Sequence, residues 1–475
     1  MTMSFALLAL LAAADPAPAA ETPPPAPEAP KVEAPAAPAP TDAPKAEAAA
    51  APVAPEAPKA DAPAAPAAPE APKVADAAKP KEEKLKLVMG DLSFAPRAML
   101  RVRAEMIGDR TLNSLPPASI IAHRARGGFD AEWKDTAKLV FEIHDTRGWG
   151  AEQTAAPPAP QDVTVFGKVA NSVDLHQGYV GLFVGPTEIR VGRQEIIFTN
   201  ERVLGLGDWG MTGRSYDAIR LSNRAAGDFN YMGFCSMVRD IDHVPTMTVP
   251  SLALCAVGVE HKLMPAFRYA PVALVELTDA ANLVQRTTLG ARFDGSVGGF
   301  SYDVDLYGQP SWVGTDVKFA FLAGARAAYE VDTMMKPKVG LALDYVSGGA
   351  PDAGDVVTFD TTWGTNHKFY GWQDFFTNLP VHTLNQGLMD AALNLNLKEG
   401  PFSAQLAVHA FAPTAYTGDG TGFYGIEPDL VARYAMTSWL NLDVGGAVFI
   451  PVGDALGRGD DGFAPWAFTA IEAKL

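Results

Sequence analysis

The chain has 475 residues, of which 48% are apolar and 20% are charged, and its formal net charge at pH 7 is −17. Its length is enough for one large domain or two ordinary ones. The acidic excess argues against nucleic acid as a partner, because proteins that bind DNA or RNA present basic surfaces. The sequence contains no run of about 18 apolar residues, which excludes a protein that crosses a membrane with helices.

Residues 1–14 are predicted to be a secretory signal peptide. Phe5 to Ala13 is apolar, and Ala12-Ala13-Ala14 resembles a signal-peptidase cleavage site. No Lys or Arg precedes the apolar stretch, so either the amino terminus alone supplies the positive charge or the true start lies upstream. The alternative interpretation is a disordered hydrophobic amino terminus.

Residues 15–85 form a low-complexity segment rich in Pro and Ala, in which APEAPK occurs at Ala26, Ala54 and Ala68. The segment lacks aromatic residues, and its frequent prolines remove backbone donors, so it cannot build a core. We expect a disordered or polyproline-like periplasmic spacer. Such a spacer is long enough to contact peptidoglycan or a periplasmic partner.

Residues 86–475 are expected to form an all-β domain, because from Arg97 onward apolar and polar residues alternate in segments of about ten. Eighteen strands are predicted, at 97–106, 119–133, 136–147, 172–184, 187–197, 214–224, 228–238, 250–262, 267–278, 287–296, 299–310, 317–330, 337–347, 387–397, 401–411, 427–436, 439–450 and 465–475.

The connections between these strands alternate between long and short. A soluble β-sandwich also alternates apolar and polar residues, but it has no reason to alternate its loop lengths in this way. Bacterial outer-membrane barrels do, with tight periplasmic turns and long external loops. The sequence therefore predicts a closed antiparallel transmembrane β-barrel, which leaves no sheet edge unpaired in lipid.

The segment Gly192–Leu221, GRQEIIFTNERVLGLGDWGMTGRSYDAIRL, joins two predicted strands and is dense in charged residues and glycine. Its charged residues can form several charge-assisted pairs, and its glycines allow tight turns. These charged residues are Arg193, Glu201, Arg202, Asp208, Arg214 and Asp217. The favoured interpretation is a loop pinned by salt bridges at the pore mouth, and the alternative is a binding site.

Together with DLHQGYV at 174–180 and FDTTWGTNHKFYGWQDFF at 359–376, this segment resembles the alginate export family of outer-membrane barrels. The resemblance covers roughly residues 97–475. It implies a position in the bacterial outer membrane, with membrane lipid and lipopolysaccharide as surroundings. It also implies a lumen whose Arg and Lys side chains accompany an acidic polysaccharide or a small anionic solute.

The alternation assigns ten basic side chains to the pore lining, namely Arg101, Arg103, Arg124, Arg126, Lys138, Arg190, Arg220, Arg292, Lys318 and Arg326. The first four lie on neighbouring predicted strands and form one basic sector. We expect their guanidinium groups to project into water as a track for anions. The alternative is a structural role, in which they neutralise Glu105, Asp130 and Glu132.

The sequence shows no phosphate-binding loop, nucleophile elbow or pair of catalytic carboxylates, so neither an enzyme nor a cofactor is predicted. His367 and Asp374 have no further ligand at metal-binding spacing, and the aromatics around them suit an interfacial girdle or a sugar-stacking platform. Three loops rich in Gly and Asp do not fit the calcium-loop pattern, and they are 347–355, 417–422 and 457–462.

The function predicted from the sequence is passive transport or export of an anionic or polyhydroxylated substrate through a charged lumen. The alternatives are a general or nutrient-uptake porin for small solutes, and an envelope tether that acts through the spacer. Cys235 and Cys255 lie on consecutive predicted strands, and a turn centred at residue 245 places them opposite each other. They form either a disulfide or two thiols that face lipid.

Overall fold

The computed structural model describes residues 85–475 except 110–111, 113–116, 150–171, 239–251, 279–283, 350–354, 417, 419–421, 454 and 457–461. The expected signal peptide, nearly all of the expected spacer and parts of the three Gly- and Asp-rich loops lie outside the described residues.

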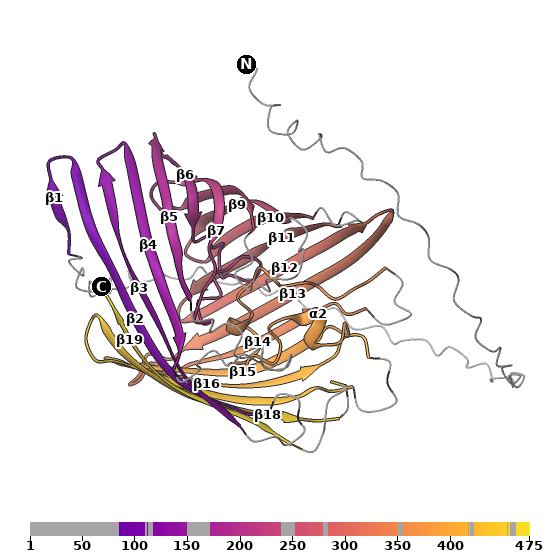
Figure 1. Ribbon diagram of the computed structural model, residues 1–475. Helices are drawn as coiled ribbons and strands as arrows, with labels where there is room; N and C mark the ends of the chain where they lie inside the picture. The colour runs from indigo at the N-terminus through magenta and orange to yellow at the C-terminus, as the bar shows by residue number, and fades with distance from the viewer. Residues whose placement is uncertain are drawn as a thin grey trace, which may run out of the picture. The chain divides into compact units, whose positions relative to one another are not determined.

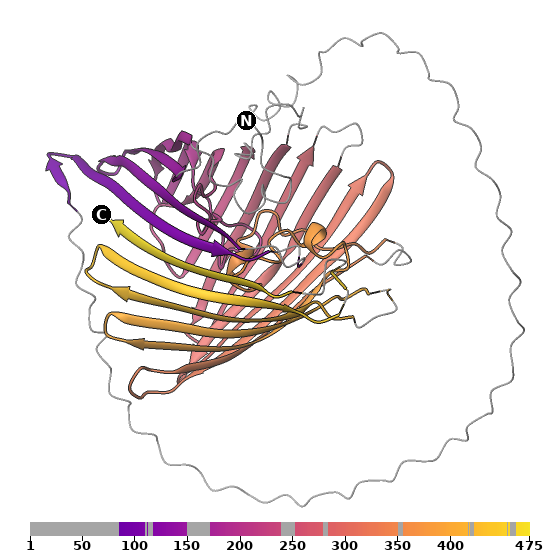
Figure 2. The same cartoon turned by 60° about the horizontal axis from the view of Figure 1, so that its bottom comes forward.

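Eighteen antiparallel strands, β2 to β19, form a closed ring in which each strand pairs with the next and β19 pairs with β2. Figures 1 and 2 show this ring from two sides. The strands are β1 (Leu87–Met89), β2 (Leu92–Ile107), β3 (Ala118–Trp133), β4 (Ala137–Gly148), β5 (Ser172–Val184), β6 (Thr187–Gln194), β7 (Tyr216–Asn223), β8 (Phe229–Met237), β9 (Leu252–Met264), β10 (Phe267–Thr278), β11 (Val284–Val297), β12 (Phe300–Val313), β13 (Asp316–Glu330), β14 (Lys338–Val346), β15 (Leu388–Glu399), β16 (Phe402–Ala412), β17 (Gly425–Ala435), β18 (Leu440–Pro451) and β19 (Ala464–Lys474). The short β1 is not part of the ring and pairs with the first residues of β2.

The predicted fold class is confirmed, and all eighteen predicted strands are present. The largest differences lie at strand ends. β2 begins at Leu92, five residues before the predicted start at 97, because it also pairs with the last residues of β3. β6 ends at Gln194 instead of 197, because the chain leaves the barrel wall there and Glu195 contacts His176 at 2.7 Å.

The outer face of the barrel is apolar, as a strand with one lipid-facing side requires. In β14, Val339, Leu341 and Leu343 are exposed by 52%, 59% and 59%, whereas the alternate residues Ala342 and Asp344 are buried toward the lumen. The structure contains no helix, within its described residues, that is long and apolar enough to cross a membrane.

The main apolar cluster lies inside the ring, where two loops fold into the lumen and pack against apolar side chains of the barrel wall. It includes Val203 and Leu204 from the loop between β6 and β7, and Phe359, Phe375 and Phe376 from the loop between β14 and β15. The second loop also carries the 3-10 helix η1 (Asn366–Lys368) and the short helix α2 (Leu379–His382). A barrel of this size is too wide for wall side chains alone to fill, so the loops supply the interior.

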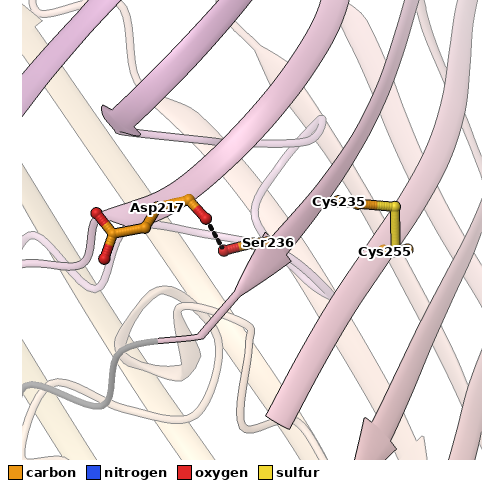
Figure 3. The surroundings of a disulfide bond; sticks show 4 residues. All are labelled: Asp217, Cys235, Ser236 and Cys255. Atoms are coloured by element: carbon orange, nitrogen blue, oxygen red, sulfur yellow. Dashed lines mark hydrogen bonds between the residues drawn. A yellow bond between two sulfur atoms is a disulfide. The ribbon is translucent and has the colours of Figure 1, made fainter. Parts of the chain in front are cut away.

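Cys235 on β8 and Cys255 on β9 are direct register partners and form a disulfide, which Figure 3 shows between the two strands. Of the two alternatives drawn from the sequence, a disulfide or two thiols that face lipid, the structure shows the disulfide. We expect no free thiol when unreduced protein is denatured and labelled, and two after reduction, since the chain has two cysteines. Two labelled cysteines in unreduced protein would contradict the bridge.

Candidate functional site

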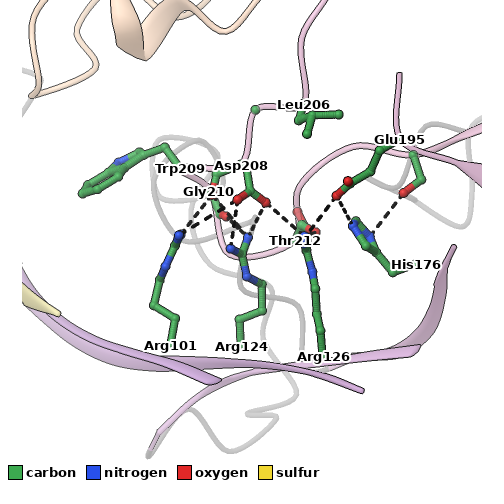
Figure 4. A network of polar contacts seen from close by, with 12 residues as sticks. Arg101, Arg124, Arg126, His176, Glu195, Leu206, Asp208, Trp209, Gly210 and Thr212 are labelled. Atoms are coloured by element: carbon green, nitrogen blue, oxygen red, sulfur yellow. Dashed lines mark hydrogen bonds and ion pairs between the residues drawn. The ribbon is translucent and has the colours of Figure 1, made fainter. Parts of the chain in front are cut away.

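The first inner loop, residues 195–215, is anchored to the barrel wall through Asp208. Arg124 Nη1 donates to Asp208 Oδ1 at 2.9 Å, and Arg126 Nη2 donates to the same oxygen at 3.1 Å. Arg101 Nη1 donates to the backbone oxygen of Asp208 at 3.0 Å, and Arg103 Nη1 donates to that of Trp209 at 2.7 Å. Figure 4 shows the guanidinium groups of Arg101, Arg124 and Arg126 converging on Asp208.

This arrangement keeps Asp208 ionised. Burial raises the pKa of Asp208, but the charges of Arg124, Arg126 and Arg101 outweigh burial, and the pKa lies below its ordinary value. Glu195 in the same loop behaves similarly. Burial raises the pKa of Glu195, but the hydrogen bond and charge of His176 and the charge of Arg126 lower it by more. The pKa of Glu195 therefore lies below its ordinary value. The loop is therefore held by carboxylates that remain charged at neutral pH.

The expectation that the basic sector projects into water is wrong for two of its members. Arg103 is 5% exposed and Arg124 is 0% exposed, because the first inner loop covers them. The alternative was that the basic sector neutralises Glu105, Asp130 and Glu132. Of these three carboxylates, only Glu105 pairs with a member of the sector, Arg103, at 2.9 Å. The other two proposed partners are held elsewhere, Asp130 by Arg97 at 2.7 Å and Glu132 by Arg224 at 3.6 Å.

Arg202 anchors the first inner loop to the opposite wall. Its Nη2 donates to Asp344 Oδ1 at 2.6 Å and its Nε to Asp305 Oδ2 at 3.4 Å, on β14 and β12. Its Nη1 donates to the Tyr370 hydroxyl at 2.9 Å, and its guanidinium lies 3.6 Å from the centre of the Phe369 ring. Arg202 is completely buried. The loop expected at the pore mouth therefore reaches across the lumen.

The second inner loop, residues 357–378, is hydrogen-bonded to the first. Arg214 Nη1 donates to Trp363 O at 2.7 Å, and Gly205 N donates to the same oxygen at 2.8 Å. Thr365 Oγ1 donates to Glu201 Oε2 at 2.6 Å, and Lys368 Nζ forms an ion pair with Glu201. The two loops thus form one unit, and moving either of them breaks contacts with the other.

The second inner loop has its own wall anchor on β17, which sequence analysis missed. Glu427 Oε1 accepts from Gln373 N at 2.9 Å, and Asp429 Oδ2 accepts from Trp372 N at 3.4 Å. Gly371 has a φ of +80°, and a Cβ there would lie 2.3 Å from Glu427 Oε1, so the position favours glycine. The alternation of residues along β17 predicts that both carboxylates face the lumen. It does not identify the backbone groups of the second inner loop that they bind.

The aromatics of the second inner loop lie inside the lumen, so the expected interfacial girdle is wrong for them. The Trp209 ring stacks on His367 at 4.4 Å and meets Trp372 edge-on at 5.4 Å. His367 Nδ1 lies 2.8 Å from Asp374 Oδ1, and the described residues contain no group of side chains arranged to hold a metal ion. These contacts show a packing role, and sugar stacking remains a prediction.

Two members of the charged segment, Arg193 and Asp217, belong to the barrel wall and not to the loop. Arg193 Nη1 lies 3.1 Å from Asp217 Oδ2, across the pairing of β6 with β7. The other pore-lining candidates lie on the lumen side, where most have acidic partners. The pairs are Lys138 with Asp130, Arg190 with Glu188, Arg292 with Asp303, Lys318 with Asp355, and Arg326 with Asp344.

A cavity of about 740 Å³ lies in the lumen beside the second inner loop, at the end of the barrel that carries the short turns. We call this cavity the vestibule. Its ionisable lining is Lys262, Arg268, Arg292, Arg326, Lys338, Lys368, Asp294, Asp303, His367 and His409. The ammonium groups of Lys262 and Lys338 form no ion pair within the part of the chain that the structure describes. Basic side chains therefore outnumber acidic ones here.

Solved structures of similar fold are outer-membrane porins. OccAB1 of Acinetobacter baumannii is 13% identical, with 80% of this chain and 97% of that chain covered, at a TM-score of 0.56. OccAB2 of the same organism is 12% identical, with 80% and 98% covered, at a TM-score of 0.56. OpdK of Pseudomonas aeruginosa, solved with vanillate, is 10% identical, with 80% and 98% covered, at a TM-score of 0.53.

No curated protein matches this chain. The family described as "Alginate export" matches residues 92–239 and 273–468, which include β2 to β8, most of β10 to β19 and both inner loops. The matched ranges cover most of the barrel. The chain therefore belongs to the alginate export family, as a channel of the bacterial outer membrane and not an enzyme.

Proposed function

We propose that this channel passively transports an anionic, polyhydroxylated substrate, an acidic polysaccharide of the alginate type, and that the vestibule selects its charge. The observation that supports the proposal is the excess of basic side chains in the vestibule. Lys262 and Lys338 keep their charges free to attract carboxylates, and partial exposure spares them the cost of deep burial.

The vestibule wall also presents groups that bind hydroxyls. Lys338 on β14 lies opposite Asn396 on β15, which in turn lies opposite Gln405 on β16. All three line the vestibule and form one row across neighbouring strands. An ammonium group followed by two amides suits a sugar acid, because the ammonium attracts a carboxylate while the amides donate to and accept from hydroxyls.

A porin for small solutes is the competing proposal, and the vanillate in the OpdK structure is the observation that favours it. The two proposals differ in how ionic current responds to uronic acid oligomers. In planar bilayers, we expect oligomers added on the side of the vestibule to block the current transiently, and neutral oligosaccharides of equal length not to. Equal responses to both would favour the small-solute porin.

The charge of the vestibule is tested by the double variant Lys262→Gln and Lys338→Gln. We expect the anion preference, measured as a reversal potential in a salt gradient, to fall or reverse because two uncompensated positive charges are removed. The change should shrink at high salt, since the Debye length falls from about 10 Å at 0.1 M to about 3 Å at 1 M.

The matched control replaces two lysines in exposed turns at the same end of the barrel, Lys134→Gln and Lys336→Gln, neither of which lines the vestibule. It removes the same charge and should leave the reversal potential nearly unchanged. If control and vestibule variants shift the potential equally, selectivity arises from overall charge and the vestibule does not set it.

A further inference from the structure

A second cavity, of about 210 Å³, lies between β7, β8, β9 and the first inner loop. We infer that it binds a small organic acid, with Arg220 holding the carboxylate. This site differs from the vestibule, and the inference does not depend on the polysaccharide proposal.

The first reason is an unbalanced positive charge on the lumen wall. Arg220 on β7 is the direct register partner of Arg190 on β6, and like charges in that position repel. Glu188 pairs with Arg190 at 2.8 Å, whereas Arg220 forms no ion pair with any described residue. One carboxylate thus serves two guanidinium groups, and an anionic ligand beside Arg220 would supply the missing negative charge.

The second reason is a set of buried polar atoms that lack partners. Nε of Arg220 and Oγ of Ser222 are both buried and make no hydrogen bond within the described part of the chain. Both residues line the cavity. Glu188 on β6, the register partner of Ser222, also carries a buried oxygen without a partner, so the protein can supply the acceptor for the Ser222 hydroxyl, and the guanidinium of Arg220 is the group left for a ligand.

The strand register fixes the order of chemical groups along the cavity. Arg220 lies level with Phe234 on β8 and Ala256 on β9. Glu260 lies four residues further along β9, about 13 Å away at roughly 3.3 Å per residue. Arg220 and Glu260 therefore lie at opposite ends.

The middle of the cavity is mostly apolar, with Ser222 of β7 as the polar residue on the same row. Met232 and Gly258 are register partners halfway between the two ends, and both line the cavity with Phe198. A Cβ at Gly258 would lie 2.3 Å from the Phe198 ring, so the glycine makes room for that ring against the wall. The volume exceeds the roughly 150 Å³ that holds a benzene molecule.

These features specify the ligand class. The carboxylate would bind the fork of Arg220. An apolar body would pack against Phe198 and Met232. Glu260 would accept a hydrogen bond from a hydroxyl at the far end. A hydroxylated aromatic acid meets all three conditions, and 4-hydroxybenzoate is a suitable probe.

The test is calorimetric titration of the detergent-solubilised full chain with 4-hydroxybenzoate and with its neutral analogue 4-hydroxybenzamide. We expect the acid to bind at least about tenfold more tightly than the amide, which corresponds to about 1.4 kcal/mol. In Arg220→Gln this preference should disappear. The variant should remain folded, because it removes a repelling charge, and thermal melting followed by circular dichroism checks this.

The matched control is Arg433→Gln, which removes a lumen arginine that lines neither cavity and pairs with Asp443. It should keep the preference for the acid. The inference is overturned if Arg220→Gln binds the acid with wild-type affinity, or if the wild-type chain shows no preference for the acid over the amide. Neither result affects the reversal potentials that test the vestibule.

Discussion

Replacing Arg202 with Met is expected to increase single-channel conductance several-fold. The change removes the guanidinium that reaches Asp305 and Asp344 across the lumen and leaves these carboxylates with Arg326 as their remaining basic partner. Removing one partner of a buried ion pair typically costs about 3–5 kcal/mol. Since the barrel wall does not depend on this contact, we expect the inner loops to undock while the barrel stays closed.

The triple variant Arg202→Met, Asp305→Asn and Asp344→Asn separates the charge effect from the loss of packing. If buried unpaired charge drives the undocking, neutralising both carboxylates should return the conductance toward the wild-type value. Heat-dependent mobility in gel electrophoresis would verify that each variant retains a folded barrel. Wild-type conductance in Arg202→Met would show that Arg202 does not hold the loops.

Asp208→Asn is expected to loosen the other side of the first inner loop and to remove an acid-dependent change in conductance. Asp208 balances the charges of Arg101, Arg124 and Arg126, and Arg124 is wholly buried. Without the carboxylate three cations face one another, but the Asp208 side chain is 39% exposed, so solvent screening keeps the expected cost below the about 3–5 kcal/mol of a fully buried pair. More frequent opening in single-channel records would report this loss.

The pH dependence has a definite sign. The pKa of Asp208 is lowered in the folded protein, so its stabilisation is complete above the unfolded pKa of about 3.9 and is lost as pH falls through the lower, folded value. Acidification should therefore open the wild-type channel in that range and have a smaller effect on Asp208→Asn. Asp217→Asn is the control, since this carboxylate lies on the wall and pairs with Arg193. An equal response to acid in all three proteins would contradict the role of Asp208.

The barrel could be predicted because each strand carries its own local signal. In β14 the alternation of Leu341 and Leu343 with Ala342 and Asp344 records one face in lipid and one in the lumen. The Cys235–Cys255 pairing followed from the midpoint of a single hairpin. These features depend on neighbouring residues in the sequence or on consecutive strands.

The filling of the lumen could not be predicted, because a lumen-facing arginine looks the same whether water or a folded loop lies beside it. Arg124 and Asp208 are 84 residues apart, and Arg202 and Asp344 are 142 apart. No periodic pattern links such positions. The density of charge and glycine in the first inner loop indicated salt bridges, but it carried no information about which wall residues would accept them.

The arrangement on which these predictions depend is that the inner loops lie inside the barrel and bridge its lumen from wall to wall. Its most direct test is cross-linking of Trp209→Cys to Phe468→Cys with a short thiol-to-thiol reagent in intact outer membranes, since the two rings are 5.0 Å apart. Phe468 is the fifth residue of β19 and is buried on the lumen side, whereas the next residue, Thr469, faces lipid. Cross-linking of 209 to 468, but not of 209 to 469, is the predicted result. If both cysteines of the 209 and 468 pair react singly with maleimide yet never cross-link, the first inner loop lies outside the lumen.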